Sequence, residues 1–185
     1  NAERGIAVGA YSSFYRTSDG GKSWQAAAEF AGDLHFNALA GGADGKVFLV
    51  GESGVILRSD DAGRSWTRIV SGINAVGPVN VVREDPKKAG LLFAGTEREV
   101  VFSADDGGSW QSLRMNMPAS SIRDLVIKDD DLVIGTHGRS FWIYDVLYNV
   151  DKMLRLAQVA KEFGSEVAGT IMFTLSPVHS HEYFA

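Results

Sequence analysis

Three copies of one eight-residue pattern, set at a nearly constant interval, constrain the fold of this chain more than any other feature. The copies are Thr17-Ser-Asp-Gly-Gly-Lys-Ser-Trp24, Ser59-Asp-Asp-Ala-Gly-Arg-Ser-Trp66 and Ser103-Ala-Asp-Asp-Gly-Gly-Ser-Trp110, and their tryptophans lie 42 and 44 residues apart. A period of roughly 40–45 residues is the length of one four-stranded propeller blade. The repeat therefore predicts a structure assembled from successive copies of one small β unit.

The repeat extends beyond the pattern itself and stops part-way through a fourth copy. A glycine stands ten residues before each of the three aspartates, at Gly9, Gly51 and Gly95. Gly135 stands ten residues before Asp145 in the same way, but Leu147 and Val150 occupy the positions of the motif glycine and tryptophan. We therefore expect about three and a half blades, the first beginning at its second strand and the last ending after its third.

Alternating apolar and polar residues within one period predict four strands, over residues 34–40, 46–51, 55–59 and 66–70. The eight-residue pattern falls between the third and fourth strands, where a tight hairpin is needed. An aspartate can accept backbone N–H groups across such a turn, and glycine tolerates a positive φ. The tryptophan then supplies an apolar plate, and Trp66, flanked by a blade on each side, is expected to be the most completely buried of the three.

These motifs resemble the Asp box, or BNR repeat, of sialidases, sortilin-type receptors and the propeller-shaped photosystem II assembly factors. Residues 1–70 look most like the assembly factors, and residues 79–145 look like the closing part of large bacterial sortilin-like propellers. The resemblance implies a mainly β fold, a partial β-propeller of four-stranded blades. It is nearly silent about activity, since fold and function separate, and the leading expectation is a non-catalytic interaction scaffold. It assigns structural roles in the turns to Asp19, Gly21, Trp24, Asp61, Gly63, Trp66, Asp105, Gly107 and Trp110.

Incomplete blades at both ends predict exposed apolar faces and unpaired strand edges, which favour association. We expect a protein partner or a second copy of the chain to complete the ring, most simply as a two-fold dimer. The net charge of −5 without a basic cluster argues against a nucleic-acid partner. No apolar run is long enough to span a membrane. The chain starts at Asn1 without a methionine, which predicts a piece trimmed or cut from something longer.

The character of the sequence changes near residue 147, so we place a boundary between a propeller portion, 1–146, and an αβ tail, 147–185. Helical spacing predicts a helix from about 150 to 163, and residues 167–174 are typical of a strand. The run 169–179 resembles one unit of the carboxyltransferase barrel of biotin-dependent enzymes. That family's metal-binding and carboxylated-lysine motifs have no counterpart here, so no carboxyl transfer is implied. Two likenesses in one short chain suggest a composite or designed sequence.

Catalysis is not expected, because the motif aspartates recur one blade apart and do not converge. The alternative is a fragment of a sialidase-like, glycan-processing enzyme, which needs three arginines around a carboxylate and a tyrosine nucleophile. No sequence feature gathers the available arginines, Arg16, Arg58, Arg123 and Arg139. Arg16 and Arg58 occupy the same place in successive repeats, which indicates a structural or rim role.

No metal or cofactor is expected. The acidic run 129–131 lacks the spaced ligands of a calcium loop and is better explained as a solvated hairpin in the last blade. His179 and His181 share one face of an extended segment, but a pair without a third ligand is a weak zinc site. His35 and His137 stand alone, and polar structural roles are expected for them.

Overall fold

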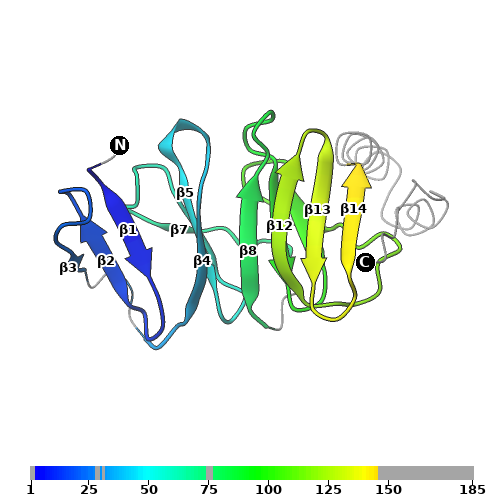
Figure 1. Ribbon diagram of the computed structural model, residues 1–185, viewed down its shortest axis with the longest axis horizontal. Coiled ribbons are helices and arrows are strands. Elements are labelled where there is room, and N and C mark those ends of the chain that lie inside the picture. Colours follow the sequence, from blue (N-terminus) through cyan, green and yellow to red (C-terminus); the bar gives the residue numbers. More distant parts are fainter. Residues whose placement is uncertain (1–2, 28–29, 31, 74–76, 146–185) are drawn as a thin grey trace.

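A computed structural model gives the fold of the chain and describes all residues except 1–2, 28–29, 31, 74–76 and 146–185. The described residues form four antiparallel sheets that follow one another along the molecule in chain order (Figure 1). Each sheet is one blade, and the arrangement is the predicted partial propeller. The helix expected over 150–163, the strand expected over 167–174 and the His179/His181 pair lie outside the described residues.

The two middle blades have four strands each, with the first strand innermost. The second blade contains β4 (Phe36–Gly41), β5 (Val47–Gly51), β6 (Ile56–Ser59) and β7 (Thr67–Arg68). The third blade contains β8 (Val79–Glu84), β9 (Leu92–Thr96), β10 (Val100–Ser103) and β11 (Gln111–Ser112). The predicted outer strand, residues 66–70, is shorter than expected: the strand covers Thr67–Arg68, and Ile69 adds one backbone bond to Ile56 of β6.

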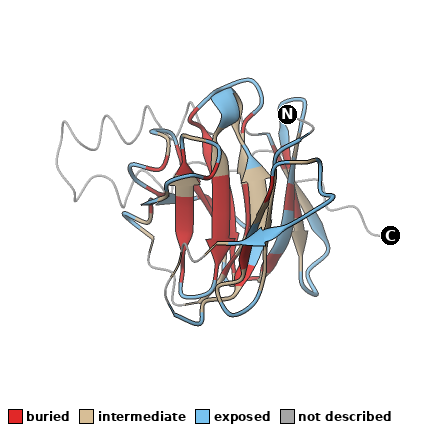
Figure 2. Cartoon of the chain, turned by 90° about the vertical axis from the view of Figure 1, so that its left-hand side faces the viewer, coloured by how far each residue is buried: buried red, intermediate tan, exposed pale blue. Residues whose placement is uncertain are grey.

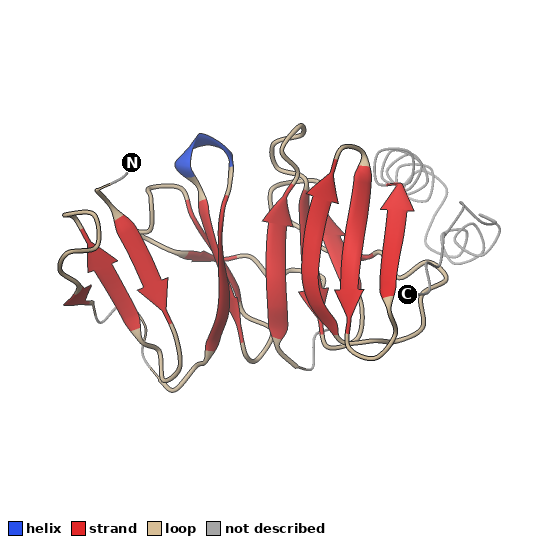
Figure 3. Ribbon diagram, in the orientation of Figure 1, coloured by secondary structure: helices blue, strands red, loops and turns tan. Residues whose placement is uncertain are grey.

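The first and last blades have three strands each among the described residues. The first contains β1 (Gly5–Val8), β2 (Phe14–Thr17) and β3 (Gln25–Ala26), and the last contains β12 (Ile122–Lys128), β13 (Asp131–Thr136) and β14 (Phe141–Asp145). By repeat position, β1 is a second strand and β14 is a third strand, as the spacing predicts. In the described part of the chain the one helical element is a short 3-10 turn, η1 (Ala43–Gly45), which Figure 3 shows beside β5. No helix there is both long and apolar enough to cross a membrane.

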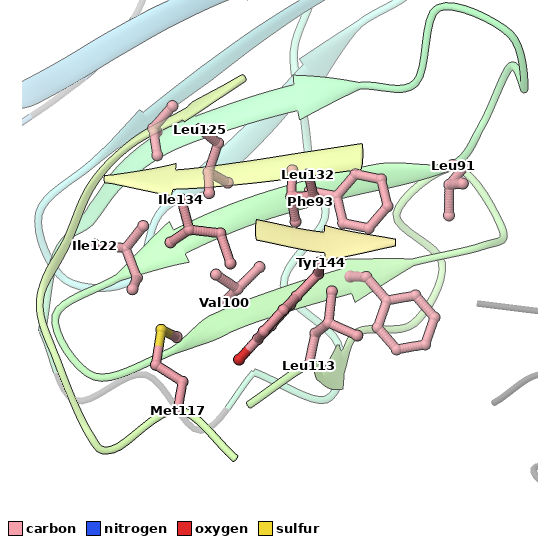
Figure 4. Packing of buried hydrophobic residues seen from close by; sticks show 12 residues of the cluster. Leu91, Phe93, Val100, Leu113, Met117, Ile122, Leu125, Leu132, Ile134 and Tyr144 are labelled. Carbon is pink, nitrogen blue, oxygen red and sulfur yellow. The ribbon is translucent and has the colours of Figure 1, made fainter. Parts of the chain in front are cut away.

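The core lies between the blades, where the apolar face of each sheet meets the next. The largest cluster joins the third and fourth blades and includes Phe93, Phe102, Leu125, Ile134 and Tyr144 (Figure 4). Burial is concentrated in the strands of the middle blades, while the connecting loops are exposed (Figure 2). Successive residues of a strand point to opposite faces of its sheet. In the third blade one set of alternate residues therefore packs against the second blade and the other set against the fourth.

The innermost strands β4, β8 and β12 lie side by side and are joined by a repeated side-chain contact. The Nδ2 amide of Asn37 in β4 donates to the carbonyl oxygen of Val79 in β8, at 3.0 Å. One blade later, Nδ2 of Asn80 donates to the carbonyl oxygen of Ile122 in β12, at 2.9 Å. Each asparagine is the second residue of its strand, so the same position links each blade to the next.

Candidate functional site

The three motif turns share one hydrogen-bond pattern. In the second blade the Ser59 hydroxyl donates to Asp61 at 2.7 Å and accepts the N–H of Gly63 at 2.7 Å. Asp61 in turn accepts the backbone N–H and the hydroxyl of Ser65, at 2.8 and 2.7 Å. Equivalent contacts are made around Asp19 and Asp105. The hydroxyl and the carboxylate thus close the hairpin from within.

These bonds set the pKa values of the motif carboxyls. Ser23, through its hydroxyl and its N–H, and then Thr17 hold the pKa of Asp19 at about 2, below its ordinary value of 3.8. The same donors at Ser65 and Ser59 hold the pKa of Asp61 well below its ordinary range. At Asp105, burial raises the pKa, but the bonds from Ser103 and Ser109 outweigh it and the net shift is downward. These carboxylates are therefore acceptors fixed in the ionised state, unsuited to donating a proton near neutral pH.

The motif glycines have two constraints. Gly21, Gly63 and Gly107 have φ values of +87°, +83° and +88°, in the left-handed region. A Cβ on Gly107 would lie 2.4 Å from Cδ1 of Ile69 in the second blade. A Cβ on Gly63 would lie 2.2 Å from Cδ1 of Ile6 in the first. The turn of one blade is thus in close contact with the blade before it.

The motif tryptophans also pack backwards, and their burial corrects one expectation. Trp110 is 3% exposed, Trp66 is intermediate and Trp24 is 45% exposed. Trp110 belongs to the cluster between the second and third blades, and the Trp66 ring meets Phe14 of the first at 6.0 Å between ring centres. Trp24 has no described blade before it. The expectation that Trp66 is the most buried is wrong, because burial depends on the blade before and increases along the chain.

The arginine before each of the first two motifs contacts the following blade. Arg16 donates to the carbonyl oxygen of Gly63, and its guanidinium lies 4.7 Å above the Phe14 ring centre. Arg58 donates to the carbonyl oxygen of Asp106 at 2.6 Å and pairs with its carboxylate at 3.0 Å. The structural role inferred from their matching positions has this geometric basis. Phe102 occupies the corresponding position before the third motif, and the blade that follows it has no motif turn among its described residues.

A groove of about 730 Å³ lies between the first two blades and carries several cationic side chains. Its walls come from β1, β2 and β3 on one side and from β4, β5 and the second motif turn on the other. Arg4, Arg16 and Arg64 contribute guanidinium groups, and Leu39 and Ile6 contribute apolar surface. No Asp or Glu is among the described residues that line it.

The described lining of the groove offers guanidinium groups and apolar surface and no carboxyl group. Glycoside hydrolysis normally uses two carboxyl groups placed on either side of the scissile bond. Arginine clusters beside apolar surface suit a carboxylate or an extended polypeptide. Sequence reasoning missed Arg4 and Arg64, because only the fold places them beside Arg16. Of the other arginines considered, Arg123 on β12 lies 3.6 Å from the Glu97 carboxylate, just after β9, and Arg139 is exposed in the last blade.

The remaining candidate residues are dispersed. The run 129–131 forms the predicted hairpin between β12 and β13, where Lys87 pairs with Asp130 at 2.7 Å. The ring Nδ1 of His35 lies 3.7 Å from Oε1 of Glu52, and the His35 ring meets the edge of the Tyr11 ring. The backbone N–H of His137 donates to the backbone carbonyl oxygen of Ser121. Asp145 ends strand β14 opposite Asp131, so in the fourth copy this position is not part of a turn. Within the described residues no three metal-ligating side chains gather.

Residues 1–147 match the family described as photosynthesis system II assembly factor YCF48. The chain belongs to this family. The match includes residues 79–145 as well as 1–70, whereas the likeness of 79–145 to sortilin-like propellers and of the tail to carboxyltransferase barrels stays a prediction.

Several solved structures share the fold. A structure of YCF48 bound to D1 peptide superposes with a TM-score of 0.62 and 21% identity over 78% of this chain and 47% of that one. The GH74 xyloglucanase of Xanthomonas campestris superposes with a TM-score of 0.58 and 20% identity over 72% of this chain and 24% of that one. By sequence, the chain is also similar to methane monooxygenase component C of Methylosinus trichosporium, with 31% identity over 90 residues, which are 46% of this chain and 26% of that protein. The chain thus spans less than half the length of each of these proteins.

Proposed function

We propose that the chain is a non-catalytic interaction module whose groove between the first two blades binds an extended polypeptide segment. Family membership supports a role as an assembly scaffold. The observation that carries the proposal is the groove itself, with Arg4, Arg16 and Arg64 around apolar walls and no carboxylate among its described lining residues. The related YCF48 structure contains a bound D1 peptide, which makes a polypeptide the natural class of ligand.

The competing function is that of a glycan-processing fragment. Its support is the shared fold of GH74 enzymes, at identities near 20%, and a shared fold does not carry an activity with it. The described motif carboxylates are also held in hydrogen bonds within their own turns. We therefore propose that the nine motif residues shape and fasten the blades and take no part in chemistry.

A peptide titration tests the proposal. A D1 peptide of the kind bound by the related protein is added to the full chain, and binding is measured by calorimetry. Arg64→Glu reverses one groove charge and is expected to weaken binding at least tenfold. Arg68→Glu, an exposed arginine on β7 that is absent from the groove lining, is the matched control and should bind like the parent. Equal affinities for both variants, or turnover of a sialoside or xyloglucan substrate, would contradict the proposal.

We further propose that the outer faces of the first and last blades take up additional blades from a second copy of the chain. Exposed apolar side chains gather there: Tyr15 and Trp24 on the first blade are 40% and 45% exposed, and Val126 and Phe141 on the last are 51% and 66% exposed. Because the chain spans about half of the related YCF48 structure, two copies have the length of one such ring.

A further inference from the structure

The second junction, between the second and third blades, holds a carboxylate of the chain itself between two cations. Nζ of Lys46 lies 2.7 Å from Oδ2 of Asp106, and Nη1 of Arg58 lies 3.0 Å from the same oxygen. The hydrogen bond to this carboxylate raises the pKa of Lys46. Asp106 belongs to the third motif turn, so a carboxylate from one blade is bound by the second and third strands of the blade before it.

The first junction, between the first and second blades, repeats the two cations. Arg4 directly precedes β1, as Lys46 directly precedes β5. Arg16 stands one residue before its motif, as Arg58 does. The register of β1 with β2 matches that of β5 with β6, so the two pairs of cations lie at equivalent places. These positions belong to second and third strands by repeat position, which both blades contain.

The carboxylates of the second junction have neutral counterparts in the first. Ala62 takes the place of Asp106 in its motif, and Ser18 takes the place of Asp60, which pairs with Arg58 at 3.0 Å. Ala62 and Asp106 share a φ of +59°, and their turns share the same closing hydrogen bonds. Ala62 also lines the groove. The second motif turn therefore presents a methyl group where the third presents a carboxylate.

The balance of charge differs accordingly. At the positions compared, the second junction carries two cations and two carboxylates, whereas the first carries three arginines and no carboxylate. The third arginine is Arg64, which stands where the third motif turn has Gly108. Arg16 donates to the carbonyl oxygen of Gly63, so its guanidinium is held against the second motif turn. The groove thus offers an incoming carboxylate the kind of donors that the next junction offers to a side chain of the chain itself.

We propose that the groove binds a carboxylate group of its polypeptide ligand beside Ala62, between Arg4 and Arg16. This proposal rests on the proposed polypeptide-binding function and adds which group of the ligand is recognised and where. The ligand carboxylate takes the role that Asp106 has in the second junction. A guanidinium can donate two parallel N–H groups to one carboxylate, so a pair of arginines favours this planar anion. Arg64, on the same lining, is placed to receive a second acidic group.

The test measures binding of an acetylated and amidated hexapeptide of aspartates to the full chain by calorimetry. Ala62→Asp places a carboxylate of the chain at the proposed position and should weaken binding at least tenfold. The variant should keep at least the parental melting temperature, because Asp106 already adopts this φ in the equivalent turn. Ala104→Asp is the matched control. It adds the same charge at an exposed position of a motif turn, and Phe102 replaces the arginine before that motif, so it should bind like the parent.

The reverse substitution in the second junction gives an independent check. Asp106→Ala converts that junction toward the arrangement of the first, because Lys46 and Arg58 then face a methyl group. It should add a second binding event for the aspartate peptide. A folded Asp106→Ala variant without this second event would contradict the comparison on which the proposal rests. Should this variant fail to fold, the pair Ala62→Asp and Ala104→Asp still decides the matter.

Two further peptides identify the group that is bound. A hexapeptide of asparagines with a free carboxyl terminus binds only if a terminal carboxylate suffices, and its amidated form should not bind. Binding of the amidated asparagine peptide as tightly as the aspartate peptide would overturn the proposal, as would equal weakening by Ala62→Asp and Ala104→Asp.

The carboxylate position and the proposed function can fail separately. If the D1 peptide binds in an Arg64-dependent way that Ala62→Asp leaves unchanged, the proposed function survives and the carboxylate position is wrong. If Ala62→Asp blocks the aspartate peptide but the D1 peptide does not bind at all, the carboxylate position survives and the polypeptide-binding function loses its support.

Discussion

The indole Nε1 of Trp110 donates a 2.7 Å hydrogen bond to the carbonyl oxygen of Ile69, across the boundary between the third and second blades. The backbone N–H of Trp110 reaches back in the same way, to Ser71 at 2.9 Å. One motif residue therefore fastens its blade to the one before through both its side chain and its backbone.

Replacing the motif tryptophans should produce graded losses of stability. Trp110→Ala is expected to lower the free energy of unfolding by about 3–5 kcal/mol, the usual range for a buried aromatic. Trp66→Ala should cost less, and Trp24→Ala about 1 kcal/mol or less, because Trp24 is 45% exposed. Urea unfolding followed by circular dichroism measures all three. Trp110→Phe is the control that keeps an aromatic ring and much of the apolar area and removes the indole hydrogen bond. Equal losses at the three positions would contradict packing onto the preceding blade.

The sequence alone predicts the blades, because turn chemistry and alternation are local properties. The period of the Thr17, Ser59 and Ser103 motifs is sufficient to count blades and to place the first chain residues in a second strand. It does not predict burial of the tryptophans, which is decided by contacts between blades about 40 residues apart. The sequence does not predict the groove, for the same reason. Arg4, Arg16 and Arg64 show no common spacing, and only sheet stacking places them around one opening.

The contact between Asn80 and Ile122 is an intermediate case. Asn37 and Asn80 are 43 residues apart, which is one blade period, so the signal was present in the sequence. An asparagine inside a strand resembles a polar residue on a solvated face, so the spacing alone does not indicate a contact. The partner is a backbone carbonyl of the next blade, and such a contact is visible only once the inner strands are known to be neighbours.

A methyl group on a motif glycine should be far more harmful than one on an unconstrained glycine. Gly107→Ala combines the strain of a positive φ with a close approach of the new Cβ to the Ile69 side chain, so we expect it to lower the free energy of unfolding by about 2–4 kcal/mol. Gly138→Ala is the matched control, because its φ is +77° and nothing lies within 4 Å of the added Cβ, and about 1 kcal/mol is expected. Adding Ile69→Val to Gly107→Ala should recover part of the loss. Additive effects of these two substitutions would show that the contact does not carry the strain.

The Arg58 contact should stabilise the junction between the second and third blades. Arg58 joins the Asp106 carbonyl and carboxylate, and Lys46 pairs with the same carboxylate at 2.7 Å. The Arg58 side chain is 22% exposed, so solvent screening is moderate, and Arg58→Ala should cost about 1–2 kcal/mol. Arg58→Lys should recover little, because one ammonium cannot reach both acceptors with the same geometry. Arg68→Ala is the exposed control and is expected to be neutral; a similar loss there would remove the special role of Arg58.

Acid should destabilise the chain through the motif aspartates. The folded pKa of Asp19 is about 2 and that of an unperturbed Asp is 3.8, and Asp61 and Asp105 are shifted in the same direction. Between about pH 4 and pH 2 the unfolded chain binds more protons than the folded chain. The stabilisation that comes from these aspartates is therefore fully present above about pH 4 and is lost as the pH falls toward 2. Asp61→Asn should lower stability at neutral pH and flatten the acid limb, as thermal unfolding from pH 6 to 2 would show. Ser65→Ala removes one donor and should have the same effect to a smaller degree. An unchanged acid limb in Asp61→Asn would show that other groups control it.

The exposed outer faces should make the chain associate, and the last blade allows a direct test. Val126, Val133 and Ile143 lie opposite one another on β12, β13 and β14, on the face that points away from the third blade, and Phe141 lies beside them. Burying these side chains against a second copy removes apolar area from water, which favours a mass of twice 20.0 kDa at micromolar concentration.

Light scattering measures this mass for the parent and for the double variant Val126→Ser, Phe141→Ser. The variant should return to the monomer, while Tyr11→Ser, which removes a 72% exposed aromatic from the turn between β1 and β2, should leave the association unchanged. Folding of each variant is checked by its melting temperature, because loss of an exposed side chain has little effect on a stable blade. A parent chain that remains a monomer at 20.0 kDa up to high concentration would exclude completion of the ring by a second copy. The groove between the first two blades would then function within a monomer.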